Sequence, residues 1–593
     1  MRSGARRYLA LFVRYVGPEW RRATLLAVLL VTGIFLQLLN PQLLRAFIDQ
    51  ATSGAEVPDL ARIAIAFMAI AFVAQVLAAI GQYVGEDLGW AATNTLRADL
   101  ALHVLRLDLS FHKARTPGEL IERVDGDVTA LATFFSRFVV NVLGNLVLMV
   151  GILVVVWHED VRAGVAFLVF ALFALIVLGR LRSVAVLEWG KVREVMAQMF
   201  GFIGERLAGT EDIRSNRAEW HVMNGLVLHH RAVYAARRAA TLRGTIVWSS
   251  TIATFALGHG MAFGVGGYLW VTSAITIGTV YLLFHYVELL RRPIEQLRRE
   301  LEEIQRAIAS IARIDALLAE RSRLPDGRGA AMAAGALPVD IDRVSFAYES
   351  GAAPGEDAGA APGELVLRDV TLRVRPGRVI GLLGRTGSGK TTLARLLMRF
   401  YDATSGTIRL GGVDVRDAPL ADLRRRATLV SQDVQLFAAS VRDNITFFDR
   451  SIGDARIVAV LERIGLGPWL RGQGGPDPLD AQLHAGALSA GEAQLLAFAR
   501  VFLRDPGLVV LDEASSRLDP ATERHIEDAI DHLLDGRTAI VIAHRLATVE
   551  RCDEIVILEA GQVVEHGPRA TLAADPSSRF ASLLRTGLEQ VLV

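Results

Sequence analysis

A glycine-rich segment carries the clearest chemistry in this sequence. Residues Gly384–Thr391, GRTGSGKT, match the pattern G-x-x-x-x-G-K-[ST] at every fixed position. The segment follows an apolar run and precedes a helix-like one, the setting in which this pattern binds phosphate. Its backbone N–H groups surround the phosphates, and the helix N-terminus adds partial positive charge. The sequence therefore predicts a nucleotide site, with Lys390 on the β- and γ-phosphates and the Thr391 hydroxyl on Mg²⁺.

A second apolar run ends in two acids. Leu508–Leu511 is followed directly by Asp512 and Glu513. Asp512 is placed to support the Mg²⁺ shell, and Glu513 is placed to orient or deprotonate an attacking water. An acidic strand end is common by itself. Together with the phosphate loop, the pair predicts ATP hydrolysis, with Glu513 as the catalytic base.

The elements that must position these residues alternate in type after residue 338. Short β-rich runs at Val379–Leu383, Ala427–Val430, Leu508–Leu511 and Thr538–Ile542 are separated by helical segments. This order predicts an α/β P-loop nucleotide-binding domain with a mostly parallel sheet over 339–593. Residues 321–338 are rich in Gly and Ala and hold two prolines, which predicts a linker. The insert Gly351–Gly363 has the composition of a loop, and we expect no chemical role for it.

The first half of the chain is far more apolar than the second. Hydrophobic residues make up 52% of the chain, and the excess lies in residues 1–290. A membrane-spanning helix needs about 20 mostly apolar residues. Six apolar runs are candidates, which predicts an α-helical six-span transmembrane domain over 1–320. The predicted spans are Ala23–Phe47, Leu60–Val84, Phe134–Trp157, Val161–Arg180, Ile246–Val271 and Ile277–Leu290.

Charge between these runs predicts their orientation. Arg and Lys gather in residues 1–22, 97–123, 180–193 and 291–299, whereas the other connections are short and almost free of positive charge. The positive-inside rule places both chain ends and the nucleotide domain in the cytoplasm, with the chain in a cell membrane. We expect the long connections 85–133 and 181–245 to be helices that continue into the cytoplasm. Helices lying on the membrane surface are the alternative.

Bulk composition excludes several classes of function. The formal net charge is +1, so charge implies no nucleic-acid partner. Cys552 is the only cysteine, which excludes an internal disulfide framework and a multi-cysteine metal site. Residues 1–22 are Arg-rich and lack a cleavage pattern, so we expect the first apolar run to be a retained span and no signal peptide.

Between the phosphate loop and the acidic pair lies Leu488-Ser489-Ala490-Gly491-Glu492, which is similar to the LSGGQ signature of ABC transporters. Four further positions resemble functional residues of that family and occur in the same order along the chain. They are Tyr348, Gln432, Asp519 and His544. The resemblance implies that Tyr348 stacks on adenine, that Gln432 contacts Mg²⁺ with Thr391 and Asp512, and that His544 assists Glu513 in catalysis. The ATP-binding residues implied are Tyr348, Gly384, Arg385, Thr386, Gly387, Ser388, Gly389, Lys390, Thr391, Thr392, Gln432, Ser489, Gly491 and Asp519.

The membrane half resembles the exporter type of this family, in which six helices precede the nucleotide domain. Phe111-His112 through Asp127-Val128 resembles the first intracellular loop. The resemblance implies a half-transporter with ATP and Mg²⁺ as cofactors. Two nucleotide domains hold two ATP molecules between them, and their opening and closing drives alternating access. The expected partners are a second half-transporter, membrane lipid and a transported substrate, which the sequence does not identify.

The signature departs from the family pattern at Ala490 and Glu492, and Leu479–Ala487 lacks the usual Thr-Glu-Val-Gly. One interpretation is a heterodimer with unequal ATP sites, because the signature serves the partner's ATP while this chain's own catalytic residues are intact. The other is a homodimer in which Ser489-x-x-Glu492 forms a capping box. Import by the same architecture, or an ATP-gated channel or receptor, are further alternatives.

Overall fold

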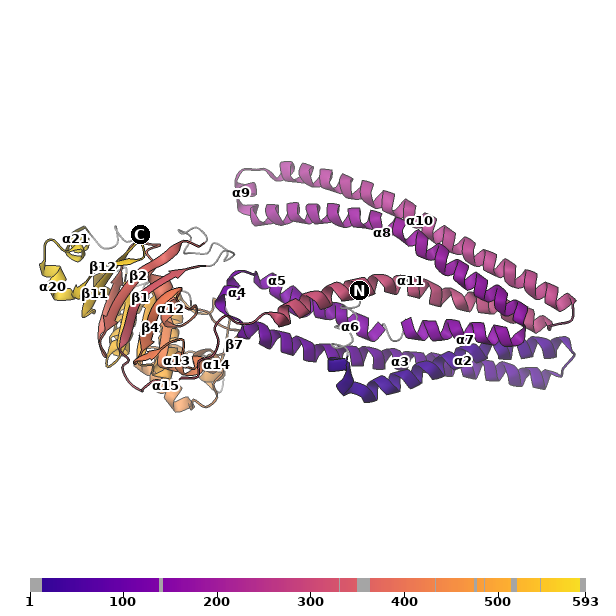
Figure 1. Ribbon diagram of the computed structural model, residues 1–593, viewed down its shortest axis with the longest axis horizontal. Coiled ribbons are helices and arrows are strands. Elements are labelled where there is room, and N and C mark those ends of the chain that lie inside the picture. Colours follow the sequence, from indigo (N-terminus) through magenta and orange to yellow (C-terminus); the bar gives the residue numbers. More distant parts are fainter. Residues whose placement is uncertain are drawn as a thin grey trace. The chain divides into compact units, whose positions relative to one another are not determined.

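The computed structural model describes residues 13–137, 142–329, 331–348, 363–431, 434–473, 477–484, 486–512, 520–543 and 546–586. The chain divides into two compact units (Figure 1). Unit 1 comprises Met1–Leu105 and Gly118–Glu320, and unit 2 comprises Arg106–Pro117 and Arg321–Val593. Unit 2 therefore includes a short segment from the first half of the chain.

All regular secondary structure in the described part of unit 1 is helical. Three of its helices have 50, 48 and 53 residues, far more than the roughly 20 that cross a bilayer. Most of the two long connections are continuations of these helices, and α8 and α10 lie side by side (Figure 1). The helices are η1 Gly17–Glu19, α2 Trp20–Thr52, α3 Val57–Arg106, α5 Pro117–Ile121, the π-helical η2 Glu122–Gly126, α6 Asp127–Arg137, α7 Gly144–Glu159, α8 Val161–Ala208, α9 Thr210–Ser215, α10 Glu219–Val271 and α11 Ile277–Ala319.

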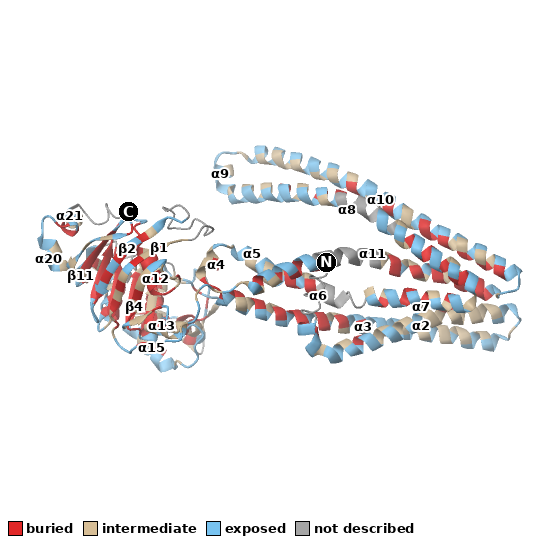
Figure 2. Ribbon diagram, in the orientation of Figure 1, coloured by how far each residue is buried: buried red, intermediate tan, exposed pale blue. Residues whose placement is uncertain are grey.

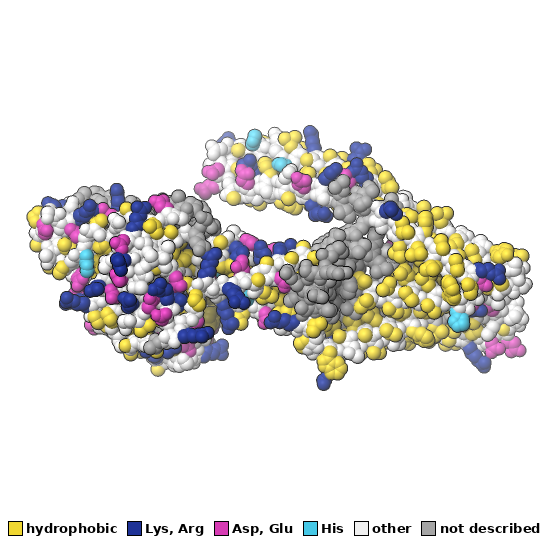
Figure 3. Space-filling view, viewed as in Figure 1, with side chains coloured by type: hydrophobic (Ala, Val, Ile, Leu, Met, Phe, Trp, Pro, Cys, Tyr) yellow, Lys and Arg dark blue, Asp and Glu magenta, His cyan; other side chains and the backbone are white. Residues whose placement is uncertain are grey.

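Within the described residues, three helical segments are long and apolar enough to cross a membrane: Val13–Thr52, Val57–Arg106 and Glu219–Val271. Gly144–Glu159 and Val161–Val177 are apolar but shorter. The predicted third span begins in α6, passes through residues outside the described set and ends in α7. Hydrophobic side chains cover much of the surface at the end of unit 1 where α2, α7 and α10 lie (Figure 3). The helical membrane region is confirmed, and the count of six spans stays a prediction.

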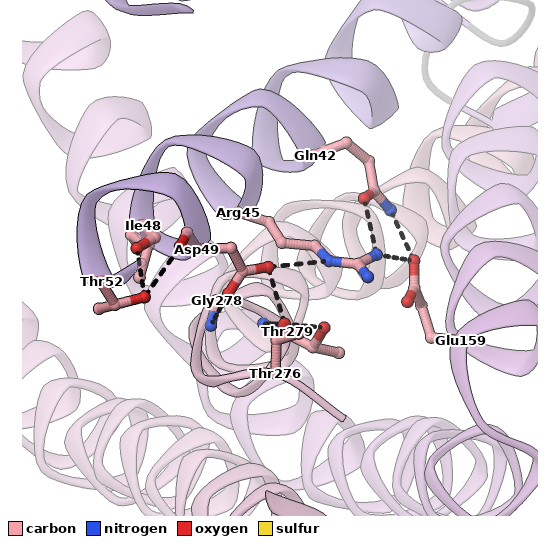
Figure 4. Close-up of polar contacts among 9 residues, drawn as sticks. All are labelled: Gln42, Arg45, Ile48, Asp49, Thr52, Glu159, Thr276, Gly278 and Thr279. Atoms are coloured by element: carbon pink, nitrogen blue, oxygen red, sulfur yellow. Dashed lines mark hydrogen bonds and ion pairs between the residues drawn. The ribbon is translucent and has the colours of Figure 1, made fainter. Parts of the chain in front are cut away.

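A polar cluster joins the ends of α2, α7 and α11 (Figure 4). Arg45 Nη1 lies 2.5 Å from Glu159 Oε1, and Arg45 Nε lies 3.7 Å from Asp49 Oδ2. Asp49 also accepts hydrogen bonds from Thr276 Oγ1 at 2.7 Å and from Gly278 N at 2.9 Å. Helix N-termini favour nearby negative charge. Asp49 of α2 therefore stabilises the N-terminus of α11 by accepting a hydrogen bond from one of its backbone N–H groups.

An ion pair between the buried Asp127 and the half-exposed Arg313 joins α6 to α11. Arg313 Nε donates to Asp127 Oδ2 at 2.9 Å, and its Nη2 also contacts Asp127. Asp127 is only 2% exposed, so its charge depends on this partner. The hydrogen bond to Asp127 raises the pKa of Arg313 above its ordinary value. The pair therefore fixes two helices of unit 1 against each other.

Unit 2 is built around a six-stranded sheet of order β12-β11-β3-β10-β9-β6. All neighbours are parallel except β11 and β12, which confirms the mostly parallel α/β prediction. A four-stranded antiparallel sheet, β2-β1-β4-β5, and a two-stranded one, β7-β8, add to it. The strands are β1 Val339–Ala347, β2 Leu365–Val374, β3 Val379–Leu383, β4 Ser405–Leu410, β5 Val413–Asp414, β6 Ala427–Val430, β7 Ala439–Ser440, β8 Gln482–Leu483, β9 Leu508–Asp512, β10 Thr538–Ile542, β11 Glu554–Glu559 and β12 Gln562–Pro568.

Buried residues run along most strands of unit 2 (Figure 2), and two hydrophobic cores lie on the two faces of the six-stranded sheet. Alternate residues of one strand lie on opposite faces of the sheet. Val509 and Leu511 of β9 pack in the first core, and Leu508 and Val510 pack in the second core. Cys552 lies in the first core, where burial raises the pKa of its thiol to about 12. The helices of unit 2 are α4 Leu109–Lys113, α12 Lys390–Leu397, α13 Leu420–Arg426, α14 Val441–Thr446, α15 Asp454–Arg463, α16 Gly467–Arg471, η4 Pro478–Asp480, α17 Ala490–Arg504, α18 Pro520–Leu534, α19 Leu546–Glu550, α20 Arg569–Ala574 and α21 Arg579–Thr586.

The segment that the sequence predicts as a linker lies against unit 2. Gly329 N donates to Asp417 O at 2.7 Å, and Met332 N donates to Asp422 Oδ2 at 2.7 Å. The side chains of Met332 and Leu337 are buried in the second core. A Cβ atom at Gly327 would lie 2.2 Å from the Asp417 carbonyl oxygen. The glycines here allow a close approach of two backbones, so this segment is held in place.

Candidate nucleotide-binding site

The phosphate loop lies between β3 and α12, as the sequence predicts. Gly384, Gly387 and Gly389 have φ angles of 153°, 81° and 102°, in the region that favours glycine. A Cβ atom at Gly389 would also lie 2.6 Å from Leu367 Cδ2. The loop can therefore turn its backbone N–H groups inward only because these positions lack side chains.

Lys390 points into the loop. Its Nζ atom donates to Gly384 O at 2.6 Å and to Arg385 O at 3.0 Å, and the residue is 6% exposed. Ser388, which is 5% exposed, has a buried hydroxyl with no hydrogen-bond partner in the described part of the chain. A buried polar group without a partner is costly. A phosphate oxygen in the loop would supply one, so these residues fit the triphosphate of ATP.

Two oxygens beside the loop fit Mg²⁺. Thr391 Oγ1 donates to Asp512 Oδ2 at 3.3 Å, which brings the start of α12 to the carboxyl end of β9. Mg²⁺ is usually held by one or two protein oxygens together with water and substrate phosphates. The absence of any cluster of three metal-binding His, Cys, Asp or Glu side chains among the described residues is compatible with such a site.

Tyr348 follows β1 and is tied to α12. Its hydroxyl lies 3.0 Å from Thr392 Oγ1, and Arg395 Nη1 donates to it at 3.3 Å. Tyr401 meets the Tyr348 ring edge-on, at 5.4 Å between centroids. Lys113 Nζ lies 5.4 Å from the centroid of the same ring. The hydrogen bonds of the Tyr348 hydroxyl to α12 and the contacts of its ring with Tyr401 and Lys113 therefore fix the orientation of the ring.

Lys113 belongs to a segment that the sequence places in the membrane half. Asp108 caps the segment's helix, α4, by accepting from Phe111 N at 3.1 Å, and its other carboxylate oxygen accepts from Arg323 N at 2.8 Å. Burial alone raises the pKa of Asp108, but the backbone donors of Arg323 and Phe111 outweigh it and hold the pKa below its ordinary value. Leu109 packs against the second core. Sequence reasoning missed Asp108 and Lys113, although an Asp directly before an apolar residue, here Leu109, is a known helix-start signal.

The signature segment opens α17, with Ser489 as the N-cap. Glu492 Oε2 accepts from Ser489 N and from Ser489 Oγ, both at 2.8 Å, and Glu492 N donates to Ser489 Oγ at 3.3 Å. The capping box that the sequence predicts under the homodimer interpretation is therefore present. Gly491 is buried in the first turn. The Ser489 hydroxyl consequently has both a donor and an acceptor within its own helix.

Four predicted site residues lie outside the described residues. They are Gln432, Glu513, Asp519 and His544. Asp512 and Ile542, which precede Glu513 and His544 in the chain, are register partners on the parallel strands β9 and β10. The roles given to these four residues remain predictions.

Comparison with known proteins identifies the family. A model of the ABC transporter transmembrane region matches residues 24–294, and an ABC transporter model matches residues 367–516. A Staphylococcus aureus protein named "Putative multidrug export ATP-binding/permease protein" is 31% identical over 579 residues, which is 95% of this chain and 97% of that protein. The chain belongs to the ABC transporter family.

Two further similar proteins match most of this ABC transporter. A Bacillus subtilis protein named as an uncharacterized ABC transporter ATP-binding protein is 28% identical over 490 residues, covering 82% of this chain and 79% of its own. The solved structure of a bacterial Atm1-family ABC exporter with ATP bound is similar in fold, with a TM-score of 0.76 at 22% identity, over 95% of this chain and 98% of that one. The chain is therefore a membrane protein whose ATPase activity is coupled to transport.

Proposed function

We propose that this ABC transporter is an ATP-hydrolysing exporter half that works with a second half by alternating access. The observation that carries the proposal is the complete phosphate loop, with Lys390, Ser388, Thr391 and Asp512 placed around one site, in a chain that also holds long apolar helices. Six spans are supported by the apolar runs of the sequence, and a cytoplasmic N-terminus and nucleotide domain are supported by the charge pattern. The exporter direction is supported by the names of the relatives.

Each residue has a physical role in this proposal. Lys390 gives up its two carbonyl partners to reach the β- and γ-phosphates, and Ser388 supplies a hydroxyl within the loop. Thr391 and Asp512 would hold Mg²⁺. Gln432, which lies outside the described residues, would be a third ligand. Bound Mg²⁺ supplies positive charge that neutralises the charge developing on the phosphates. Glu513 takes a proton from the attacking water, and His544 assists it as the second catalytic residue.

We also propose that the second half is a different chain, so that the two ATP sites are unequal. The signature of one half serves the ATP held by the other, and its serine is expected to donate to the γ-phosphate. Here the Ser489 hydroxyl lies 2.8 Å from Glu492 Oε2. The Glu492 charge also lowers the positive potential of a helix N-terminus that should receive phosphate, a cost of about 0.3–1 kcal/mol when exposed. Both effects disfavour hydrolysis at the partner's site.

The test expresses this chain alone in membrane vesicles and measures ATP hydrolysis with and without added substrates. The proposal predicts weak hydrolysis by the chain alone, and about a two- to fivefold rise when Glu492→Gln removes the charge from the signature. Glu462→Gln removes an exposed carboxylate elsewhere in unit 2 and serves as the control. Robust, substrate-stimulated hydrolysis that Glu492→Gln leaves unchanged would end the unequal-pair proposal. A conductance without vesicle uptake would identify a channel instead.

A further inference from the structure

The helix that follows the phosphate loop ends at an unusual residue. α12 closes with two backbone hydrogen bonds, from Phe400 N to Arg395 O at 2.9 Å and from Arg399 N to Leu396 O at 3.0 Å, which is the pattern of a Schellman motif. The residue after the C-cap of this motif has a left-handed conformation and is usually glycine. Here it is Arg399, with a φ angle of 50°. A large side chain kept in this region suggests that the side chain itself has a function.

The Arg399 side chain is buried between α12 and the linker, residues 321–338. The residue is 1% exposed, although arginine is almost never fully buried unless it is paired. Its Nε donates to Asp402 Oδ1 at 3.0 Å, and its Nη2 donates to Pro325 O at 3.0 Å. Asp402 balances the positive charge, and Pro325 belongs to the linker. Arg399 therefore bonds the linker to the end of α12.

The guanidinium of Arg399 can form a further bond. Its Nη1 is buried and has no hydrogen-bond partner among the described residues. A buried donor without a partner costs free energy. A shift of the linker that brings another carbonyl to Nη1 would therefore be favourable.

The linker also contacts α13. Asp326 Oδ1 accepts from Leu420 N at 2.7 Å, and Met332 N donates to Asp422 Oδ2 at 2.7 Å. α13 leads directly into β6. Gln432, the predicted Mg²⁺ ligand, follows β6 and lies outside the described residues. The linker is thus bonded to two helices that are adjacent in the chain to predicted ATP-site residues.

ATP would act at the opposite end of α12. Lys390, the first residue of this helix, donates to Gly384 O and Arg385 O, and in the proposed function it exchanges these partners for phosphate oxygens. The helix has 8 residues, so its ends are about 12 Å apart. Rigid secondary elements of this kind carry a displacement from one end to the other. A movement of Lys390 towards the phosphates would therefore displace Arg399 as well.

We propose that Arg399 couples ATP binding to the linker, so that ATP strengthens the contacts of residues 323–329 with unit 2. The linker follows α11, the last helix of unit 1, so this route runs within one chain from the phosphate loop to that helix. The proposal rests on the proposed function for its ligand, ATP. Coupling between two sites is reciprocal, so loss of the Arg399 contacts must also weaken ATP binding.

The test measures hydrogen–deuterium exchange on the full chain, with any partner that it carries, in lipid nanodiscs. A non-hydrolysable ATP analogue is added with Mg²⁺ at saturating concentration. In the unaltered chain we expect slower exchange at residues 384–392 and about fivefold slower exchange at 323–329, the lower end of the usual range for coupled sites. Arg399→Gly suits the φ angle but removes the guanidinium. In this variant the analogue should still protect 384–392, its effect on 323–329 should fall below about twofold, and its dissociation constant should rise about fivefold.

Arg343→Gly is the matched control. Arg343 also has a left-handed φ angle, 47°, but its side chain is 76% exposed, so this variant should behave as the unaltered chain. If Arg399→Gly does not fold, Arg399→Lys takes its place with the same expected losses, because lysine keeps the charge but lacks the fixed fork of donors.

Two results would overturn the coupling and leave the proposed function intact. One is protection of 384–392 in the unaltered chain without slower exchange at 323–329. The other is full protection of 323–329 in the Arg399 variant. Absence of any protection at 384–392 would instead refute ATP binding at this loop, and the coupling with it.

Discussion

Asp108 offers a sharp test of how a segment from the first half of the chain is held in unit 2. Replacing Asp108 by Ala removes the N-cap of α4, worth about 0.5–2 kcal/mol. It also removes the 2.8 Å hydrogen bond from Arg323 N to a charged acceptor, worth about 1.5–3 kcal/mol. The sum is about 2–5 kcal/mol of local stability. Asp108→Asn can still cap the helix, so we expect roughly half that loss.

Hydrogen–deuterium exchange on the full chain in nanodiscs measures this loss. Since about 1.4 kcal/mol is a factor of ten, amide exchange in residues 106–117 and 321–325 should become about 30- to 4,000-fold faster in Asp108→Ala. Asp160→Ala is the control, because Asp160 caps α8 in unit 1 in the same way. Unchanged exchange at residues 321–325 in Asp108→Ala would refute the reasoning.

The same bond has a defined pH dependence. The pKa of Asp108 is lowered in the folded chain, so its contribution is complete above the ordinary Asp value of about 4. The contribution is lost as the pH falls through the lower, folded value. Exchange at residues 321–325 in the unaltered chain should therefore accelerate only in that acidic range, and in Asp108→Asn this step should be absent.

Three further predictions test the site and unit 1. Glu513→Gln should keep ATP binding and slow hydrolysis about 10²–10⁴-fold in single-turnover assays; near-normal turnover would contradict its role as base. Tyr348→Ala should weaken binding of a fluorescent ATP analogue by about 1–3 kcal/mol. Tyr348→Phe loses the 3.0 Å contact with Thr392 and should weaken the same binding by about 1 kcal/mol. Equal losses of binding in the two variants would show that the hydroxyl, and not ring stacking, matters. Asp127→Asn should lower the thermal unfolding midpoint because Arg313 loses its buried partner, whereas an unchanged midpoint would show that the pair contributes nothing.

Local patterns predict the structure well where one physical requirement decides the residue. The glycines at 384, 387 and 389 announce the phosphate loop because their φ angles exclude most other side chains. The spacing of Ser489 and Glu492 announces the capping box because both partners lie within one helical turn. The membrane helices are visible because apolar length is itself the requirement.

Contacts between distant segments escape such patterns. Asp108 and Arg323 are 215 residues apart in the chain, and neither local sequence shows the other. The antiparallel pairing of β1 with β2 and β4 was not predicted, because it joins segments that are distant in the sequence and includes register shifts in β1. The Gly- and Ala-rich composition of residues 321–338 indicates a linker, yet the same glycines permit a close approach to Asp417. Composition alone does not distinguish freedom from tight contact.

Cys552 has a practical consequence for watching this transporter move. It is the only cysteine of the chain, it is 3% exposed, and its thiol is kept protonated by a pKa of about 12. The thiolate is the form that reacts with labelling reagents, so the native chain is nearly silent towards them. Cysteines introduced in pairs, for example at exposed positions of α8 and α10, can carry spin labels or fluorophores without removal of any native residue. Distances between the helices can thus be followed through an ATP cycle in an otherwise unaltered molecule.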